Sequence, residues 1–128
     1  MLDSMKTKTF YIDGSGARPD GKGSGWAWVY EDRNLQRVKW IDHLTSNEAE
    51  YHGLIAVLKY VSPGSSVLIL SDSQLVCNQF TGKFRVKEPR LKRLLGEANR
   101  VIEERNLSVE LEWISREENV AGKLLERR

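Results

Sequence analysis

The spacing of apolar residues changes near Thr45, and this change limits the folds that the chain can adopt. Before it, turn residues separate three short β-prone runs, over Lys8–Asp13, Trp26–Tyr30 and Gln36–Ile41. After it, "TSNE" forms a capping box and apolar residues recur at helical spacing as far as Val61. The sequence therefore predicts an antiparallel meander of three strands, followed by a helix.

Two further strands are predicted in the second half of the chain, each joined to the one before it through helices. Val67–Leu70 is a continuous apolar run, typical of a strand buried on both faces, whereas Leu107–Ile114 alternates like a half-exposed strand. Helices are expected over Ser73–Phe80, from Pro89 to about Arg105, and roughly from Asn119 onward. Because strand-helix-strand crossovers imply parallel pairing, we predict an α/β fold with a mixed five-stranded sheet and helices on both faces.

Composition narrows the class of protein without identifying a function. A length of 128 residues, 40% of them hydrophobic and 30% charged, is ordinary for one globular domain, so we expect a single domain over 1–128, with 1–6 disordered or peripheral. The single cysteine, Cys77, excludes a disulfide framework, and we expect a cytoplasmic protein. No apolar stretch approaches the roughly 20 residues that cross a bilayer, so we expect no membrane association. The net charge of +2 is too small to indicate nucleic acid by itself.

Three carboxylates occupy positions that suggest a common site. Asp13 ends the first strand, and Asp72 lies at the carboxyl end of the fourth. If these strands are parallel neighbours, both side chains emerge at the sheet edge where open α/β sheets bind ligands. Glu50, in the first turns of the helix after Thr45, joins them if its side chain points to the same edge. Any one of these acids alone is more simply explained as a cap or a turn residue.

Carboxylates gathered in this way repel one another unless a cation neutralises them. The set contains hard oxygen ligands and no histidine or cysteine cluster, which favours Mg²⁺, with Mn²⁺ as a substitute. Two such ions about 4 Å apart suit in-line hydrolysis of a phosphodiester, because one activates water and the other stabilises the leaving 3′ oxygen.

Several ordered segments resemble type 1 ribonuclease H in its compact form, from about Thr9 to Asn119. They read "YIDGSG", "TSNEAEYHGLIAVL", "LILSDSQLVCNQFTGKFRVKEPRLKRLL" and "WISREEN". The resemblance implies a ribonuclease H-like sheet in the order 3-2-1-4-5, two divalent metals, a four-carboxylate site, and hydrolysis of the RNA strand of RNA–DNA hybrids. Asp13, Glu50 and Asp72 match the first three acids of the family.

The fourth acid of the family has no counterpart in this chain. Relatives usually carry Ala-Asp-x-Leu-Ala shortly after the asparagine that matches Asn119, but Gly122 or Lys123 occupies the place of that aspartate here, depending on the alignment. Asn119 or Glu118 is the first candidate for a substitute oxygen, a water-filled vacancy the second, and Glu126 the third. Lys123 is an alternative source of charge compensation. We expect the site to remain active, with weakened activity or a preference for Mn²⁺.

Substrate contacts are expected on two sides of the acids. A dense basic tract between residues 83 and 93 suggests a face for the nucleic acid backbone, with a solvated loop as the alternative reading. Telling RNA from DNA requires contacts to 2′-hydroxyls, which the resemblance assigns to the segments around the acids. The candidate substrate-binding residues are Gly14, Ser15, Gly16, Ser46, Asn47, Gln74, Lys83, Arg85, Lys87 and Arg116.

Three functions are compatible with these features. The first is an endoribonuclease acting on RNA–DNA hybrids, with no obligatory protein partner. The second is a catalytically silent module that binds hybrids or other nucleic acid on the same scaffold. The third is another nuclease of this fold, such as a junction resolvase, since a fold alone does not fix a function.

Overall fold

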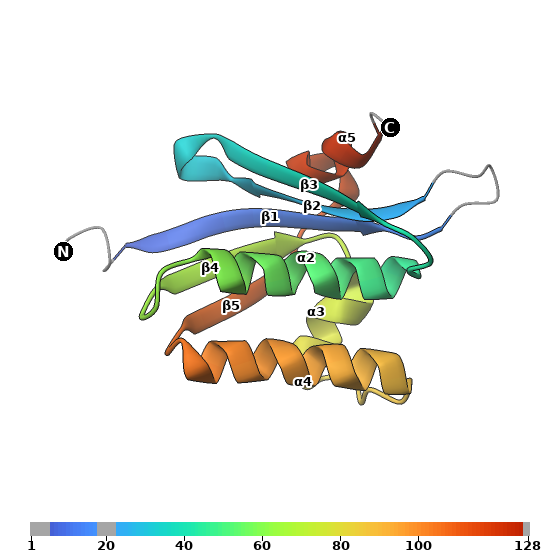
Figure 1. Cartoon of the computed structure of the whole chain (residues 1–128). Coiled ribbons are helices and arrows are strands. Elements are labelled where there is room, and N and C mark those ends of the chain that lie inside the picture. Colours follow the sequence, from blue (N-terminus) through green and yellow to red (C-terminus); the bar gives the residue numbers. More distant parts are fainter. Residues whose placement is uncertain (1–5, 18–22, 127–128) are drawn as a thin grey trace.

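A five-stranded mixed sheet forms the centre of the molecule (Figure 1). The computed structural model describes residues 6–17 and 23–126, and the statements below concern those residues. The order β3-β2-β1-β4-β5 is the one predicted. The expectation for residues 1–6 lies outside the described residues apart from Lys6, which is exposed. The strands are β1 (Thr7–Ser15), β2 (Ser24–Tyr30), β3 (Leu35–Ile41), β4 (Ser66–Ser71) and β5 (Ser108–Trp113).

The strands pair as predicted: the first three form an antiparallel meander, and the last two are parallel strands reached through helical crossovers. β1 pairs antiparallel with β2, and β2 with β3. β4 is parallel to both of its neighbours, β1 and β5. The β1–β4 register pairs Ile12 with Ser71, and this pairing fixes which residues follow at the carboxyl edge.

Helices cover both faces of the sheet, as predicted. In Figure 1, α2 and α4 lie on one side of the sheet and the short α5 lies on the other. A single 3₁₀ turn, Arg116–Glu118, connects β5 towards α5. The helices are α2 (Ser46–Tyr60), α3 (Gln74–Phe80), α4 (Pro89–Glu104) and α5 (Val120–Glu126).

Successive side chains of β1 point to opposite faces of the sheet and contribute to two separate layers of the core. Phe10 and Ile12 are fully buried in the larger cluster, which the sheet forms with α2 and α4. Tyr11, on the opposite face, packs against a smaller cluster that includes Ala121 and Leu124 of α5. Burial of each large apolar side chain contributes about 1.5–3 kcal/mol, so the α2 layer supplies most of the stabilisation. The α5 layer is thin and lies next to the end of β1.

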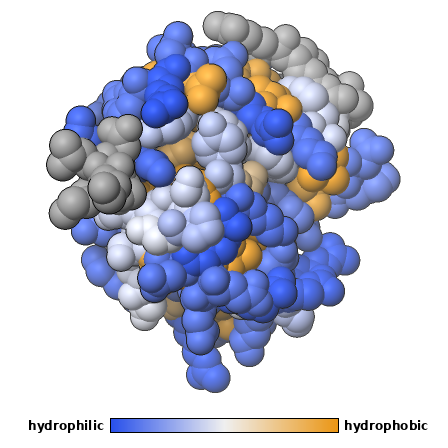
Figure 2. Space-filling model, turned by 60° about the vertical axis from the view of Figure 1, so that its left-hand side comes forward, coloured by the Kyte–Doolittle hydropathy of each residue, from blue (hydrophilic) through white to orange (hydrophobic). Residues whose placement is uncertain are grey.

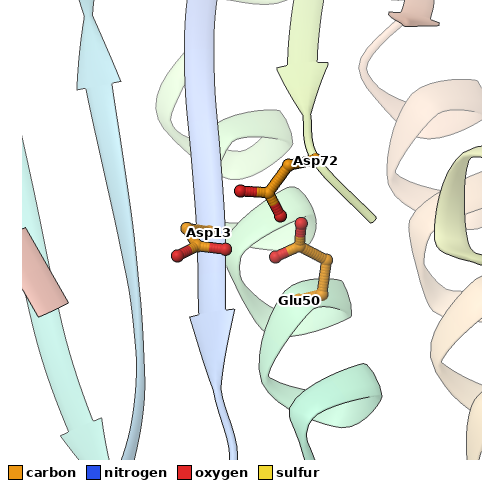
Figure 3. A group of neighbouring side chains, drawn as sticks. All are labelled: Asp13, Glu50 and Asp72. Atoms are coloured by element: carbon orange, nitrogen blue, oxygen red, sulfur yellow. The ribbon is translucent and has the colours of Figure 1, made fainter. Parts of the chain in front are cut away.

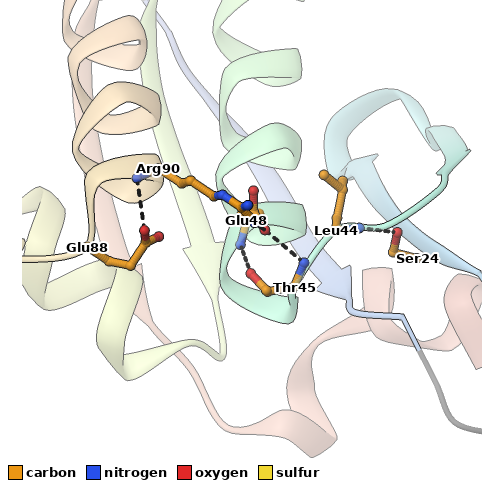
Figure 4. Close-up of polar contacts among 6 residues, drawn as sticks. All are labelled: Ser24, Leu44, Thr45, Glu48, Glu88 and Arg90. Atoms are coloured by element: carbon orange, nitrogen blue, oxygen red, sulfur yellow. Dashed lines mark hydrogen bonds and ion pairs between the residues drawn. The ribbon is translucent and has the colours of Figure 1, made fainter.

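The capping box positions α2 as the sequence predicted. Thr45 Oγ1 accepts a hydrogen bond from Glu48 N at 3.1 Å, and Glu48 Oε1 accepts one from Thr45 N at 3.1 Å (Figure 4). Glu48 is thereby used at the start of the helix, and Glu50 is left for another role. Arg90, in the first turn of α4, lies 3.9 Å from Glu48 Oε1, while Glu88 caps α4 by accepting from Arg90 N. The amino-terminal ends of α2 and α4 are therefore neighbours.

The face drawn in Figure 2 is largely hydrophilic, and hydrophobic residues are visible there only as small scattered areas. Among the described helices, none is both long enough and apolar enough to cross a membrane.

Candidate metal centre

Asp13, Glu50 and Asp72 converge at the carboxyl edge of the sheet (Figure 3). Because Ile12 is paired with Ser71, the two residues that follow lie side by side: Asp72 comes directly after the end of β4, whereas Asp13 is still within β1, which continues to Ser15 beyond the predicted strand end. Glu50 projects towards them from α2, and one carboxylate oxygen from each residue lies within 4.8 Å of the others. The convergence expected from the ends of the strands is thus present in the structure.

Glycines allow the end of β1 to lie directly against α2. A Cβ on Gly14 would come within 2.3 Å of Glu50 N and 2.5 Å of Ala49 C, both of them backbone atoms. A Cβ on Gly16 would lie 2.6 Å from Ser46 N, and Gly16 N donates a hydrogen bond to Ser46 Oγ. These two glycines therefore allow the backbone that follows Asp13 to lie directly against α2, the helix that carries Glu50.

Replacing Gly14 with alanine is expected to lower the free energy of unfolding by about 2 kcal/mol, because the added methyl group must push α2 away from β1. Chemical denaturation would measure this change. Gly96, inside α4, is a matched control, since a Cβ there meets nothing within 4 Å. Gly96→Ala should stabilise the protein by up to about 1 kcal/mol through helix propensity. Equal effects of the two substitutions would contradict the close-approach explanation.

Glu50 is almost completely buried, with 3% of its surface exposed. Its Oε1 accepts a hydrogen bond from Ser71 Oγ, whereas its Oε2 is buried and has no hydrogen-bond partner among the described residues. Burial, followed by the negative charge of Asp13, raises the pKa of Glu50 well above its ordinary value. A carboxylate that meets two other acids and has a buried oxygen without a hydrogen-bond partner is a group that a cation would satisfy.

Asp13 is held in a similarly unfavourable environment for an anion. Burial, followed by repulsion from Asp72, raises the pKa of Asp13 to about 7, although the Gly14 N–H and the charge of Arg116 act in the opposite direction. Three carboxylates that meet at one point, as Asp13, Glu50 and Asp72 do, match the ligand preferences of Mg²⁺ or Mn²⁺. The residues present therefore fit a hard divalent cation.

Asp72 is fixed through both its backbone and its side chain. Trp113 Nε1 donates to the Asp72 carbonyl oxygen at 3.1 Å, and Asn119 Nδ2 donates to Asp72 Oδ2 at 3.2 Å. Trp113, although half exposed, is therefore part of the support of the site. These bonds hold one carboxylate oxygen of Asp72 on the Asn119 side.

Asn119 connects three elements around the site. Its Nδ2 also donates to Ile12 O at 2.8 Å, and its Oδ1 accepts from Ala121 N at the start of α5. Because its amide oxygen caps the helix and its nitrogen faces Asp72, this arrangement does not present Asn119 as the oxygen ligand that was predicted. Glu118 accepts a hydrogen bond from Ser115 Oγ at 2.8 Å, and its charge acts on Tyr11. Neither of the first candidates places a free oxygen between the acids.

Gly122 and Lys123 are the two residues that the sequence offered for the place of the fourth acid. A Cβ on Gly122 would lie 3.0 Å from Asp13 Oδ2, so Gly122 lies directly against Asp13. Lys123, the other possibility from the sequence, lines the same cavity of about 400 Å³. Glu126 and Arg116 also line this cavity.

The predicted substrate-binding residues fall into two groups. The first surrounds the acids: Gly14, Ser15, Ser46 and Arg116 line the large cavity, and Asn47 lines an adjoining one of about 250 Å³. The second group lies farther along the chain. Gln74 is exposed at the start of α3, and the segment between α3 and α4 carries Lys83, Arg85 and Lys87, all exposed. Among the described residues, no hydrogen bond or ion pair joins these four side chains to the three acids, and none of the four lines either cavity.

Two supporting residues were not predicted in the roles that they have. Ser71 orients Glu50 and also accepts a hydrogen bond from Ser73 N. Ser71 could have been suspected of a supporting role because it directly precedes Asp72 at the end of β4, where it is fully buried. Asn119 was predicted as a ligand rather than as the residue that positions Asp72.

Comparison with known sequences gives a consistent family assignment. Residues 12–126 match the reverse transcriptase-like family. The bifunctional protein Rv2228c of Mycobacterium tuberculosis is 32% identical over 111 residues, which is 83% of this chain and 30% of that protein. An uncharacterized protein of Mycobacterium bovis matches to the same extent. The chain thus spans less than a third of the length of these relatives.

Solved structures show the same fold. The N-terminal RNase H domain of Rv2228c has a TM-score of 0.71 at 26% identity, covering 94% of this chain and 96% of that one. LC11-RNase H1 in complex with an RNA/DNA hybrid has a TM-score of 0.77 at 31% identity, covering 92% and 93%. RNase H1 of the archaeon Halobacterium salinarum shares the fold, with a TM-score of 0.76 at 24% identity over 96% of this chain and all of that one. The chain belongs to the reverse transcriptase-like family, and its domain has the ribonuclease H fold.

Proposed function

We propose that this domain is a metal-dependent endoribonuclease that hydrolyses the RNA strand of RNA–DNA hybrids, with Mg²⁺ or Mn²⁺ bound by Asp13, Glu50 and Asp72. The observation that carries the proposal is the meeting of three carboxylates, with one oxygen from each within 4.8 Å of the others, at a buried Glu50 whose Oε2 has no hydrogen-bond partner among the described residues. A relative of 31% identity, LC11-RNase H1, was crystallised with an RNA/DNA hybrid, which supports the choice of substrate.

Each supporting residue has a role in keeping the acids ready to bind cations. Ser71 holds Oε1 of Glu50, and Oε2 is left without a hydrogen-bond partner among the described residues. Asn119 restrains Asp72 by donating to Oδ2. Two bound divalent ions would activate a water molecule and stabilise the leaving 3′ oxygen. Arg116, at the rim of both cavities, is placed to offset the charge of a phosphate.

The hybrid would approach over the amino-terminal end of α2. Ser15, Ser46 and Asn47 surround the acids there, and their hydroxyl, amide and backbone groups are suited to 2′-hydroxyl contacts. Gln74, at the start of α3, is proposed as a further contact. The exposed basic segment of Lys83, Arg85 and Lys87 precedes α4, whose first turn lies beside that of α2. We assign it to the phosphate backbone, where it would make binding strongly dependent on salt.

A panel of labelled substrates tests the proposal. The protein would be incubated with an RNA–DNA hybrid, duplex DNA, duplex RNA and a four-way DNA junction, each with Mg²⁺, Mn²⁺ or EDTA. Cleavage of only the RNA strand of the hybrid, dependent on metal, is the expected result. Cleavage of the junction in place of the hybrid would instead identify a resolvase of the same fold.

One observation favours a second function, a hybrid-binding module without catalysis. Gly122 stands beside Asp13 where a fourth acid would be expected, and it contributes no ligand atom. Binding of the hybrid without cleavage in either metal would establish this second function and exclude the first.

A further inference from the structure

Gly122 lies next to Asp13 but offers no side chain, so a ligand from α5 would have to come from another residue of this helix. A methyl group at this position would already be 3.0 Å from Asp13 Oδ2, so the glycine lies directly against the carboxylate. Gly122 and Asp13 line the same cavity, to which the glycine contributes no ligand atom. The position four residues on from Gly122, on the same helical face, is Glu126.

The direction of helical side chains brings Glu126 back towards Gly122. In an α-helix each Cα–Cβ bond tilts towards the amino terminus, and a long side chain covers the turn that precedes its own Cα. Glu126 therefore extends over the turn of Gly122. Consistent with this, Glu126 lines the same cavity as Asp13 and Asp72.

Other acids near the cavity are less well placed. Glu118 is hydrogen-bonded to Ser115 Oγ, and its charge acts on Tyr11. Glu117 also lines the cavity, but from the 3₁₀ turn Arg116–Glu118 and not from the helix that carries Gly122. Asn119, which could offer a neutral oxygen, uses that oxygen to cap α5. Glu126 is thus the acid that lines the cavity from the same face of α5 as Gly122.

We propose that Glu126 is the fourth carboxylate of the centre, reaching past Gly122 to share a divalent ion with Asp13. This inference rests on the proposed function and names a ligand that lies one helical turn from the position used by the family. In this proposal, the longer side chain of Glu126 takes the role of the family's fourth aspartate. Gly122 stands at the helical position nearer to Asp13, where that aspartate would be expected.

Binding of Mn²⁺, measured by calorimetry on the protein without nucleic acid, tests this assignment. Glu126→Gln is expected to weaken Mn²⁺ binding at least about tenfold while leaving the metal-free fold unchanged by circular dichroism. Gly122→Asp combined with Glu126→Gln should restore wild-type affinity, since the new aspartate lies against Asp13. Glu117→Gln and Glu118→Gln remove the same charge nearby and should bind Mn²⁺ within about twofold of wild type.

The outcomes separate this inference from the proposed function. Loss of binding in Asp72→Asn, but wild-type affinity in Glu126→Gln, would overturn the role of Glu126 and leave the metal centre standing. The role would also be overturned by equal losses in Glu117→Gln and Glu126→Gln, because general charge would then explain both. Absence of Mn²⁺ binding to the wild-type protein would overturn the metal centre itself.

Discussion

Replacing Asp72 with asparagine is expected to slow cleavage of an RNA–DNA hybrid by at least about a thousandfold, because metal-assisted charge stabilisation contributes several kcal/mol to such a barrier. The substitution preserves the shape of the side chain and removes one negative charge from a site that depends on clustered anions. Asp72 follows β4 directly, and its carboxylate meets those of Asp13 and Glu50 within 4.8 Å. Single-turnover cleavage at saturating Mn²⁺ would measure the loss.

The fold should survive this substitution, so the loss can be attributed to chemistry. The backbone oxygen of Asp72 keeps its hydrogen bond from Trp113 Nε1. Asp32→Asn is a matched control, since Asp32 is an exposed aspartate in a 3₁₀ turn at the β2–β3 connection. That variant should cleave at the wild-type rate. Cleavage by Asp72→Asn at a similar rate would exclude Asp72 from catalysis.

The metal-free protein should become more stable when Asp13 is replaced with asparagine, by about 2–4 kcal/mol at pH 8. Burial and Asp72 raise the pKa of Asp13 from 3.8 to about 7, so the folded state binds its proton more tightly than the unfolded state does. The stability that this proton confers is present in full below about pH 4 and is lost as the pH rises through about 7. Asparagine carries no such charge and avoids the loss.

Urea denaturation between pH 4 and pH 8 in EDTA would measure this difference. The advantage of Asp13→Asn should be small at pH 4 and should grow steadily towards pH 8. Addition of Mg²⁺ should then stabilise the wild-type protein more than the variant, because binding to the folded state alone adds RT ln(1 + [L]/Kd). A difference that does not change with pH would show that Asp13 is not under the repulsion described above.

Much of this fold follows from local sequence signals that agree with the final packing. The capping box at Thr45 and the proline at the start of α4 give both helix starts correctly. The change from the meander to crossovers gives the parallel pairing of β4, and this pairing brings Asp13 and Asp72 together. These features depend on short-range patterns and on the rule that parallel strands end at one edge.

The details around the missing acid depend on distances that no local pattern encodes. The sequence allowed either Gly122 or Lys123 to be aligned with the fourth aspartate of the family. The structure favours Gly122, because a Cβ at this position would lie 3.0 Å from Asp13 Oδ2. Asn119 was predicted as a ligand because its residue type permits it. Its orientation is decided by three partners from distant segments, including Ile12 O and Asp72 Oδ2. Only the packed structure shows that its oxygen is already engaged.

The position of bound Mn²⁺ in a crystal of this protein, located by anomalous scattering, tests the metal centre most directly. We expect a peak among the carboxylate oxygens of Asp13, Glu50 and Asp72, at ligand distances of about 2.1 Å. The same peak should be absent or much reduced in crystals of Asp72→Asn. A saturating soak that leaves these three side chains without a peak in the wild-type protein would contradict the account.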